Sequence, residues 1–433
     1  MQVDRPDPET YLTQALTSPQ LPQELRPFYE AFQRFHANRL WYQLTLTLES
    51  FLSLPTSAPF RIDLYRSFIS SFAAKLDPLK HASIAVSVAR TFENGSEAVE
   101  FLDGLLPGLT APVAVSASEE KKKAEKKEGK DKEAEKDEAA STKPPPSPPA
   151  SMPKTSDPDC RQPFVLLTME RAHFLLLLGQ ADETKEAMER CERILEGLDS
   201  VETVVNAAFY RVSGDYWKAK AEFADYYRNS LLYLACIDPS RDLSPSDRQS
   251  RAHDLGISAL LGSIYNFGEL LMHPILESLV GTEGEVVKKL LEVFNRGDIA
   301  GFERLVPEIG EKEPFLQQHF PFLREKICLL ALIEAVFKRP TSDRTLLPFS
   351  VISREAQVPV DEVEHLVMKA LALKLIRGTL DQVSSHVSIS WVQPRVLDRT
   401  QIDGLRARLS EWTDKVAGVE LGAREGAGEL IVQ

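Results

Sequence analysis

The sequence has little cysteine: four residues in a chain of 433, none of them close neighbours. They stand at positions 160, 191, 236 and 328, so no CxxC pair is present. Disulfide-stabilised small folds and zinc sites are usually marked by closely spaced cysteines. We therefore expect neither a disulfide framework nor a zinc site, and the chain fits a reducing compartment, the cytoplasm or the nucleus.

Long apolar segments are also missing. The longest unbroken apolar runs, such as Ile327–Ile333, have seven residues, whereas a membrane-spanning helix needs about 20. The first ten residues contain neither a basic nor an apolar segment, so we expect no secretory signal there. The formal net charge of −13 disfavours a general affinity for nucleic acid or anionic membranes. The sequence thus predicts a soluble protein with no membrane or nucleic-acid partner.

Motifs of catalysis are absent as well. The eight histidines form no HxH or HExxH pair, and neither the phosphate-binding GxxxxGK nor the nucleophile motif GxSxG occurs. Cys328 lies in an apolar helical stretch, where a thiol is usually inert packing. His365 is expected at a surface or interface. We expect no catalytic, cofactor-binding or metal-binding residue, and hence no enzyme.

What the chain does contain is a long charged and proline-rich segment. Nearly every residue of 119–138 is charged, with acids and bases almost balanced, and residues 139–158 are rich in proline. Neither part can bury enough apolar surface to offset the entropy of ordering. We predict a disordered linker over residues 111–162. A nucleic-acid patch is the alternative reading of its lysines, but the neighbouring acids cancel their field.

Before this linker the pattern is helical. The stretch PFYEAFQRFHANRLWYQLTLTLESFL places apolar residues at steps of three and four, as one face of a helix requires. Trp41 and Tyr42 fall within it, and we assign both to packing. Residues 1–110 are therefore expected to form an N-terminal region of helical repeats.

After the linker the pattern indicates helix pairs. Gly179 and Gly214 each follow an apolar-periodic stretch and are predicted to end a helix. Their separation of 35 residues is close to the period of tetratricopeptide-like hairpins. Stacked hairpins bury faces that none can bury alone. The fold class is thus mainly α, with a helical-hairpin solenoid over residues 163–340.

A tight turn between two helices is expected in the stretch LLEVFNRGDIAGFERL, residues 290–305. Gly297 can adopt the left-handed conformation that closes the first helix. Asp298 can cap the second helix. Phe294 and Phe302 then belong to the buried faces of the two helices. With no second ligand nearby, the Gly–Asp pair is interpreted as structural and not as a metal or phosphate element.

Residues 341–397 change in pattern and predict a winged helix. SREAQVPVDEVEHLVMKALALKL reads as two short helices, with Asp361 and Glu364 as a capping box. IRGTLDQVSSHVSISWV then alternates at two-residue spacing, as a strand pair does. Helix, helix, strand, strand is the order of a winged helix.

The strands carry the first candidate contact residues. Val387, Ile389 and Trp391 are predicted to lie on one face of the sheet and to bind a partner. DNA reading is the alternative use of such a fold. The second helix begins with Asp361 and Glu362 and carries no arginine, which disfavours DNA. We therefore expect a protein-contact surface that includes any open strand edge.

A final helix is predicted over residues 398–418, followed by a flexible tail over 419–433. Its apolar residues recur at spacings of three and four, the pattern of a coiled-coil seam. They are Ile402, Leu405, Leu409, Trp412 and Val416. We expect this seam to bind partner helices, and packing on its own domain is the alternative.

A helical solenoid that runs into a winged helix resembles the PCI-domain family, shared by scaffold subunits of the proteasome lid, the COP9 signalosome and a translation initiation complex. The segments LLEVFNRGDIAGFERL, IYNFGELLMHPILESL, PFSVISREAQVPVDEVEHLVMKALALKLIRG and VSISWVQPRVL resemble the lid members in particular, and RLWYQLTLTLESF resembles their N-terminal region. The similarity covers about 11–110 and 163–417.

The resemblance implies a non-catalytic scaffold that supports complex assembly and ubiquitin-dependent protein degradation, without a cofactor. It implies partners among the other lid PCI subunits, bound through winged-helix edges and a C-terminal helical bundle. Proximity to the ubiquitin receptor and the deubiquitinase subunits is also implied. The alternatives are a PCI subunit of a sister complex or a nucleic-acid-binding winged-helix protein.

Overall fold

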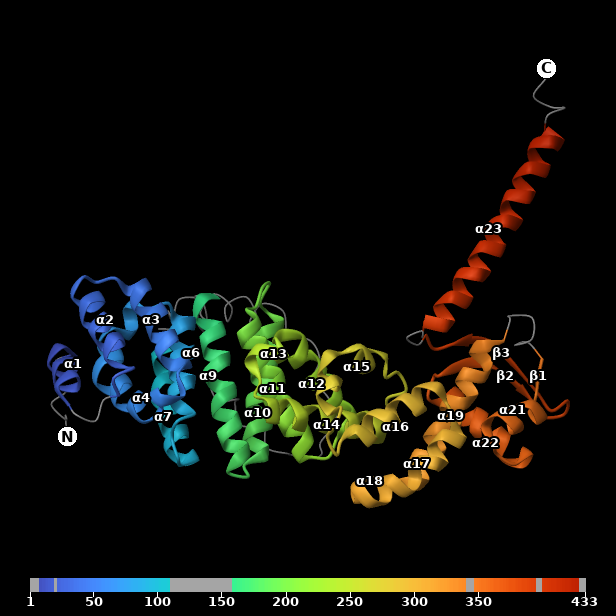
Figure 1. Ribbon diagram of the computed structural model, residues 1–433, viewed down its shortest axis with the longest axis horizontal. Helices are drawn as coiled ribbons and strands as arrows, with labels where there is room; N and C mark the ends of the chain where they lie inside the picture. The colour runs from blue at the N-terminus through green and yellow to red at the C-terminus, as the bar shows by residue number, and fades with distance from the viewer. Residues whose placement is uncertain (1–7, 19–21, 110–157, 340–345, 395–398, 428–433) are drawn as a thin grey trace, which may run out of the picture. The chain divides into compact units, whose positions relative to one another are not determined.

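The computed structural model describes residues 8–18, 22–109, 158–339, 346–394 and 399–427 (Figure 1). Most of the predicted linker, residues 111–157, lies outside these ranges. Its predicted end is wrong, because helix α9 (Pro158–Leu177) begins five residues before position 163. Pro158 is compatible with this start, since proline lacks an N–H that the first turn leaves unpaired anyway, whereas Pro163 lies inside the helix.

The chain divides into two compact units. The first unit comprises residues 1–220 and 232–237, and the second comprises 221–231 and 238–433. Among the described residues, no helix combines the length and apolar character needed to cross a membrane.

The first unit is built from helices alone in its described part. Their bounds are α1 Pro8–Thr17, α2 Arg26–Ala37, α3 Trp41–Ser53, η1 Pro55–Ser57, α4 Ala58–Leu64, the π turn η2 Tyr65–Ile69, α5 Ser70–Phe72, η3 Ala73–Lys75, α6 Pro78–Ala89, α7 Gly95–Leu109, α9 Pro158–Leu177, α10 Ala181–Glu196 and α11 Thr203–Ala219. Helix α12, Phe223–Cys236, contributes to both units. The expected N-terminal helical repeats are therefore present.

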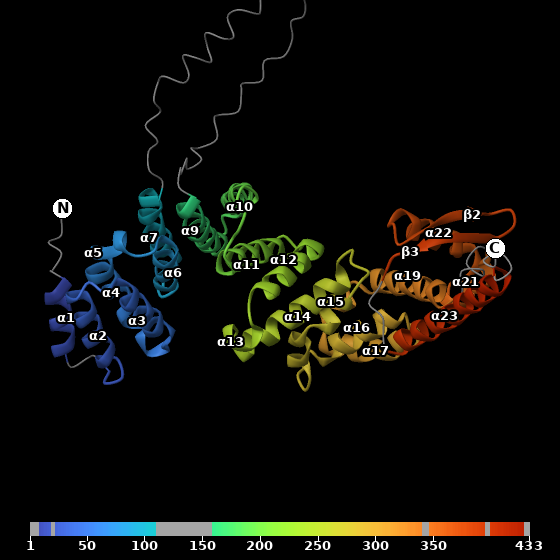
Figure 2. The ribbon, with the colours of Figure 1, turned by 90° about the horizontal axis from the view of Figure 1, so that it is seen from above.

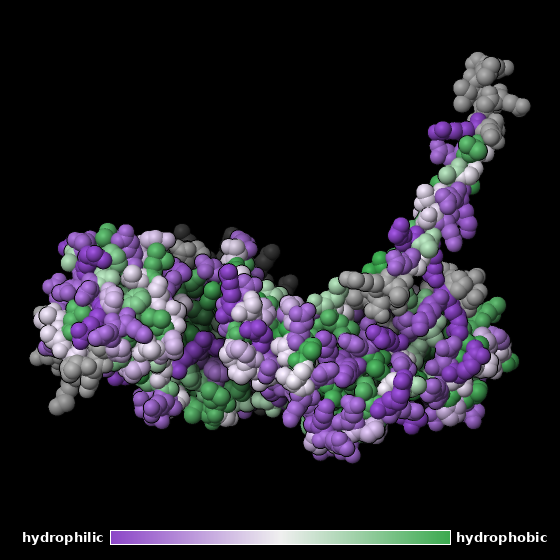
Figure 3. All heavy atoms as spheres, viewed as in Figure 1, coloured by the Kyte–Doolittle hydropathy of each residue, from purple (hydrophilic) through white to green (hydrophobic). Residues whose placement is uncertain are grey.

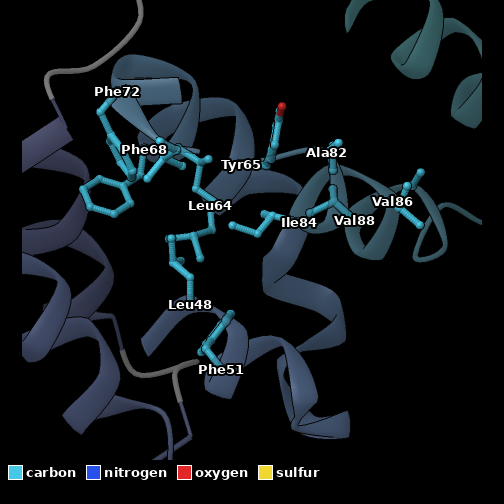
Figure 4. Packing of buried hydrophobic residues seen from close by; sticks show 14 of the residues in the cluster. Leu48, Phe51, Leu64, Tyr65, Phe68, Phe72, Ala82, Ile84, Val86 and Val88 are labelled. Carbon is cyan, nitrogen blue, oxygen red and sulfur yellow. The ribbon is translucent and has the colours of Figure 1, made fainter. Parts of the chain in front are cut away.

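An aromatic core holds the first helices together (Figure 4). Phe32 and Phe51 are fully buried, with ring centroids 5.7 Å apart in an edge-to-face arrangement. Phe68 and Phe72 continue the cluster at 4.9 Å. Such pairs add about 0.5–1.5 kcal/mol to the area they bury. This core, which extends to α9, accounts for the apolar spacing that predicted the helices.

The assignment of Trp41 and Tyr42 to packing is half right. Trp41 stacks on Phe72 at 5.6 Å and is partly buried. Tyr42 is 76% exposed, so that part of the prediction is wrong. Neighbouring residues of a helix point about 100° apart, so only one of the two can face the core.

Of the two predicted glycine helix ends, only Gly179 is one. It follows α9 with φ +85°. Gly214 is buried inside α11, which continues to Ala219, so the predicted stop there is wrong. The chain breaks at Ala221 instead, with φ 58°. The 35-residue period inferred from the two glycines therefore does not hold.

The second unit contains further helices and one small sheet. Its elements are α13 Pro239–Asp242, α14 Pro245–Leu261, α15 Gly268–Met272, η4 Pro274–Leu279, α16 Glu285–Arg296, α17 Ile299–Lys312, α18 Pro314–Gln317, α19 Phe320–Lys338, β1 Leu347–Pro348, α21 Phe349–Ala356, α22 Val360–Ala372, β2 Ile376–Asp381, β3 His386–Val392 and α23 Arg399–Ala427. The mainly helical class and the winged helix are confirmed, with α22 packed against β2 and α19 against β3 (Figures 1 and 2).

The sheet has the order β1–β3–β2, and both pairings are antiparallel. Strand β1 was not predicted from the sequence, because two residues are too short for an alternation to show. It pairs Leu347 with Val387 and leaves β2 as the longer of the two outer strands.

A buried lysine joins two helices of the second unit. Lys326 of α19 is 1% exposed, and its ammonium donates to three carbonyl oxygens at the end of α14 at 2.7–2.9 Å: Ala259, Leu260 and Gly262. The rings of Tyr265 and Phe267 lie within 5.4 Å of the same nitrogen. Burial lowers the pKa of Lys326 to about 7. The lysine thus satisfies helix-end carbonyls that α14 cannot pair itself.

Candidate partner-binding site

The joint at Gly297 has the predicted geometry. Gly297 ends α16 in the left-handed conformation, with φ 67°. A side chain there would also meet the backbone of Ala331 at 2.9 Å, so both conformation and space require glycine. Asp298 caps α17, since its Oδ1 accepts from the N–H of Gly301 at 3.0 Å. Phe294 and Phe302 meet edge to face at 5.5 Å. The joint packs α16 against α17, and its role is structural.

The expectation that Val387, Ile389 and Trp391 share one face is wrong. Val387 and Ile389 are 1% and 3% exposed and belong to the winged-helix core, whereas Trp391 is 38% exposed. The ladder shifts between Arg377 and Gly378: Trp391 pairs with Arg377, and Ile389 pairs with Gly378. One residue of β3 is therefore extra, and such a bulge reverses the alternation beyond it.

Glycine at position 378 makes this bulge possible. A Cβ there would clash with the carbonyl of Ser388 and would lie 3.0 Å from the Cα of Ile389. No ordinary side chain fits without moving the strand. The only sequence signal for the bulge is thus a glycine inside a strand pattern.

Beyond the bulge, the Trp391 side chain is on the solvent-facing side of the sheet, beside a charged residue of β2. The guanidinium of Arg377 is 4.7 Å from the centre of the indole ring. Such a cation–π contact is worth about 0.5–1 kcal/mol at an exposed site. Tryptophan and arginine are the residues most often found as anchors in protein interfaces. The pair forms a semi-exposed platform on the outer strand β2 and its neighbour β3.

The predicted capping box at the start of α22 is also wrong. The helix begins at Val360, Pro359 takes the N-cap position, and no side chain caps it. Glu364 instead accepts a hydrogen bond at 3.0 Å from the amide of Gln382 in the β2–β3 hairpin. The acidic residue ties the helix to the wing, a long-range contact that spacing along the chain does not show.

Helix α23 is longer than predicted and exposes its seam. It spans 29 residues, Arg399–Ala427, so the predicted flexible tail is wrong over 419–427 and lies outside the described residues from 428 on. The seam residues are 46–66% exposed: Ile402, Leu405, Leu409, Trp412 and Val416. Val419, three positions further, continues the pattern and is exposed too. Apolar groups are visible along this helix in Figure 3. The structure thus leaves an apolar seam of six positions exposed on α23.

Cys328 and His365, the two residues considered for catalysis, are not part of a catalytic arrangement of side chains in the described structure. Cys328 and His365 line one open cavity of about 900 Å³ beside α19 and α22. Burial raises the pKa of the Cys328 thiol, which keeps it protonated and poorly nucleophilic. Within the described parts of the chain, no group of three or more His, Cys, Asp or Glu side chains could hold a metal ion.

A buried ion-pair cluster in the first unit was missed by the sequence reading. Glu170 is fully buried. Its carboxylate forms ion pairs with Nε of Arg90 at 2.7 Å and with Nη2 of Arg211 at 2.5 Å. Burial alone would raise the pKa of Glu170, but the two arginines hold it below its usual value. The cluster joins α6, α9 and α11. Its members are far apart in sequence, so no spacing could have revealed it, and its geometry is that of a structural tie.

Comparison with known proteins accounts for this architecture. Residues 28–291 match the family described as PSD13 N-terminal repeats, and residues 310–391 match the PCI domain. The chain is 35% identical to a probable 26S proteasome regulatory subunit rpn9 of Schizosaccharomyces pombe, over 91% of both chains. It is 34% identical to the 26S proteasome non-ATPase regulatory subunit 13 homolog A of Arabidopsis thaliana, over 94% of this chain and 96% of that one.

A third relative agrees with these two. The 26S proteasome regulatory subunit RPN9 of Saccharomyces cerevisiae is 34% identical over 94% of both chains. By contrast, subunit 7 of the COP9 signalosome complex from Dictyostelium discoideum is 28% identical over only 35% of this chain. The relatives matched over their full length are regulatory subunits of the proteasome, and several are named as non-ATPase. The chain therefore belongs to the family of 26S proteasome regulatory subunits represented by non-ATPase subunit 13 and RPN9.

Proposed function

We propose that the chain works as a non-catalytic scaffold subunit in the lid of the 26S proteasome regulatory particle, where it supports assembly and ubiquitin-dependent protein degradation. The observation that carries this function is the match to such subunits over 91–94% of the chain, repeats and PCI domain together. A sister-complex role has less support, because the COP9 relative matches only about a third of the chain.

The scaffold binds its partners through two surfaces. The first is the outer edge of the winged helix, formed by β2 and by the Arg377–Trp391 platform. An outer strand presents unpaired N–H and C=O groups to which another chain can add. Val387 and Ile389 lie beneath this surface and hold its strands in place from the core.

The second surface is the seam of α23. Its exposed leucines and Trp412 fit the knobs-into-holes packing of a helical bundle. None of the five apolar seam residues on α23 is charged, so burying their side chains requires little desolvation of polar groups. Other lid PCI subunits, with the ubiquitin receptor and the deubiquitinase subunits nearby, are the partners we propose, in cytoplasm and nucleus.

Nucleic acid is not the ligand that this geometry favours. The guanidinium of Arg377, the nearest candidate for base contacts, is stacked on Trp391. Helix α22 presents Asp361 and Glu362 in its first turn, which would repel phosphates.

Purification of a tagged chain from cells, followed by quantitative mass spectrometry, tests the proposal. Proteasome regulatory subunits should be recovered in stoichiometric amounts together with the tagged chain. Recovery of COP9 or initiation-complex subunits in their place would overturn the assignment to the lid.

A further inference from the structure

The first unit contains an open cavity of about 900 Å³ that the scaffold role does not explain. It is lined by η1, α4 and the π turn η2 on one side, and by the connection from α6 to α7 on the other. Three arginines face it: Arg61, Arg66 and Arg90. All these elements lie within the first unit, and α4, α6 and α7 are labelled in Figures 1 and 2.

Arg61 is fixed in position without a counter-ion. Its Nη2 donates to the carbonyl oxygens of Leu52 at 2.6 Å and Leu54 at 3.0 Å, and its Nε donates to the hydroxyl of Ser57 at 2.9 Å. These acceptors are neutral, and burial lowers the pKa of Arg61. No carboxylate among the described residues pairs with it. A pre-positioned guanidinium of this kind binds an oxyanion with little loss of side-chain entropy.

The second arginine reaches the same cavity by ordinary helical spacing. Ala58, Ile62 and Arg66 follow one another at steps of four residues and all line the cavity, with Arg61 next to Ile62. The π turn at Tyr65–Ile69 begins at this point, and the N–H of Ser70 donates to the carbonyl oxygen of Tyr65. Single π turns are rare and frequently occur at functional sites.

Arg66 is the more accessible of the two. Its guanidinium lies 5.9 Å from the centre of the Phe92 ring and makes no hydrogen bond or ion pair within the described part of the chain. All of its N–H donors are therefore available to a ligand. Arg90 differs from both, because its Nε and Nη2 are bonded to a carboxylate, that of Glu170, which already pairs its charge.

Two acids at the rim limit what the cavity can accept. Glu93 and Glu97 also line it, and Glu97 accepts a hydrogen bond from Asn94 at 2.7 Å. A ligand with many negative charges, such as a polyphosphate, would face both carboxylates. A ligand with one acidic group directed at Arg61 and Arg66 avoids that repulsion.

Two exposed leucines follow one another where α9 ends. A Cβ at Gly95 would lie 3.7 Å from the side chain of Leu178, and Gly95 directly follows Asn94, which lines the cavity. Leu177 and Leu178 are 68% and 50% exposed, an unusual pair for the surface of a folded unit. They offer an apolar contact that a free inorganic anion would not use.

We propose that this cavity binds a short segment of a partner protein in which an acidic side chain engages Arg61 and Arg66 while an apolar neighbour covers Leu177 and Leu178. The acidic group is a carboxylate or a phosphorylated side chain, both of which fit a pair of guanidinium groups. The inference rests on the proposed function, because the segment belongs to another subunit of the assembled particle.

Photocrosslinking in the assembled particle tests this site even though the partner is unidentified. Glu93→p-benzoylphenylalanine places the reactive group at the rim, on an exposed side chain with no hydrogen bond in the described structure. Trp412→p-benzoylphenylalanine, in α23, reports on the scaffold surface in parallel. Mass spectrometry of the Glu93 product should identify a partner peptide with an Asp, a Glu or a phosphorylated residue beside an apolar one, and phosphatase treatment before assembly distinguishes the two acidic sources.

Arg66→Gln is the deciding variant, because Arg66 makes only its ring contact and should be dispensable for folding. It should lower the crosslink yield at Glu93 about tenfold, as the loss of a charge-assisted hydrogen bond implies. Arg34→Gln is the matched control: Arg34 is also exposed and lies 5.5 Å from the ring of Phe35, but outside the cavity. It should leave the yield unchanged.

Several outcomes overturn the proposal. A crosslink at Trp412 with none at Glu93 would leave the scaffold role standing and remove the cavity site. A Glu93 crosslink that survives Arg66→Gln, or that joins a segment without an acid, would do the same. Thermal stabilisation of the free chain by inorganic pyrophosphate that Arg66→Gln abolishes, with no peptide crosslink, would show a small-anion site instead. Failure to enter the particle at all would count against both proposals.

Discussion

Helices α16 and α23 both carry apolar stripes, but only the stripe of α16 is buried. In α16 the stripe is buried almost completely: Val286, Val287, Leu290, Leu291 and Phe294. In α23 every seam residue from Ile402 to Val416 is about half exposed. Periodicity therefore predicts that a face will be covered, but not whether the same chain covers it. The stripe of α16 stabilises the second unit, whereas we propose that another molecule covers the stripe of α23.

The largest expected effect breaks the buried stripe. Phe294→Ala removes a fully buried ring that meets Phe302, and such truncations cost about 3–5 kcal/mol. The free energy of unfolding of the isolated chain, measured by urea titration, should fall by that amount. Phe294→Leu, which retains most of the volume, should cost much less. Equal losses for the two variants would show that volume at this joint is not what stabilises it.

The exposed stripe should respond in the opposite way. Leu409→Ala combined with Trp412→Ala removes two candidate anchors, each worth roughly 2 kcal/mol in an interface, and should weaken incorporation about a hundredfold after allowing for non-additivity. The melting temperature of the free chain should hardly change, because both side chains are exposed there.

The matched control for that pair is Tyr42→Ala with Leu46→Ala. These residues are exposed on α3 and belong to neither proposed surface. They should affect neither incorporation nor melting. If the α23 variant melts several degrees lower on its own and still assembles once folded, the seam packs within its own chain and the partner assignment is wrong.

The same distinction explains how much could be predicted from the sequence. Local geometry was predictable where one residue type suffices, as at Gly297, whose conformation and close approach to Ala331 both exclude a side chain. The winged helix was predictable from its change of period. The resemblance in long segments supplied the family, which the full-length relatives confirm.

What failed depends on contacts between distant residues. The bulge that turns Trp391 outward is a property of the pairing between β2 and β3, so alternation along β3 alone misplaces this residue. Gly214 looked like a helix end, but it is buried inside α11. The Glu170 cluster and the lysine that caps α14 join elements up to 80 residues apart. Charges so far apart in sequence give no periodic signal.

Two glycine-to-alanine substitutions compare the packed winged helix with the exposed helix α23, since each adds one methyl group. Gly378→Ala introduces a Cβ into the carbonyl of Ser388 and should destabilise the winged helix by about 1–3 kcal/mol, as overpacking does. Gly404→Ala, on α23, meets nothing within 4 Å. It should stabilise the helix by up to about 1 kcal/mol and so raise the helical content. Circular dichroism and urea unfolding measure both, and destabilisation by Gly404→Ala would indicate a hidden contact of α23.

The last effect concerns pH and again separates the interior from the seam. The pKa of Lys326 is about 7 in the folded chain, against 10.5 as its ordinary value. Between these values the unfolded chain binds the proton more strongly than the folded chain, so stability rises with pH, by at most about 1.4 kcal/mol per pH unit. Urea unfolding at pH 7, 8 and 9 should show this rise relative to Lys326→Met, which cannot titrate but is less stable throughout because it leaves three carbonyls unpaired. Incorporation into the particle through α23 should show no matching trend in this range, since none of the five apolar seam residues titrates.

A constant difference in the free energy of unfolding between wild type and Lys326→Met from pH 7 to 9 would contradict this prediction. It would mean that the three carbonyls keep the ammonium charged throughout, and that the joint between α14 and α19 does not respond to pH.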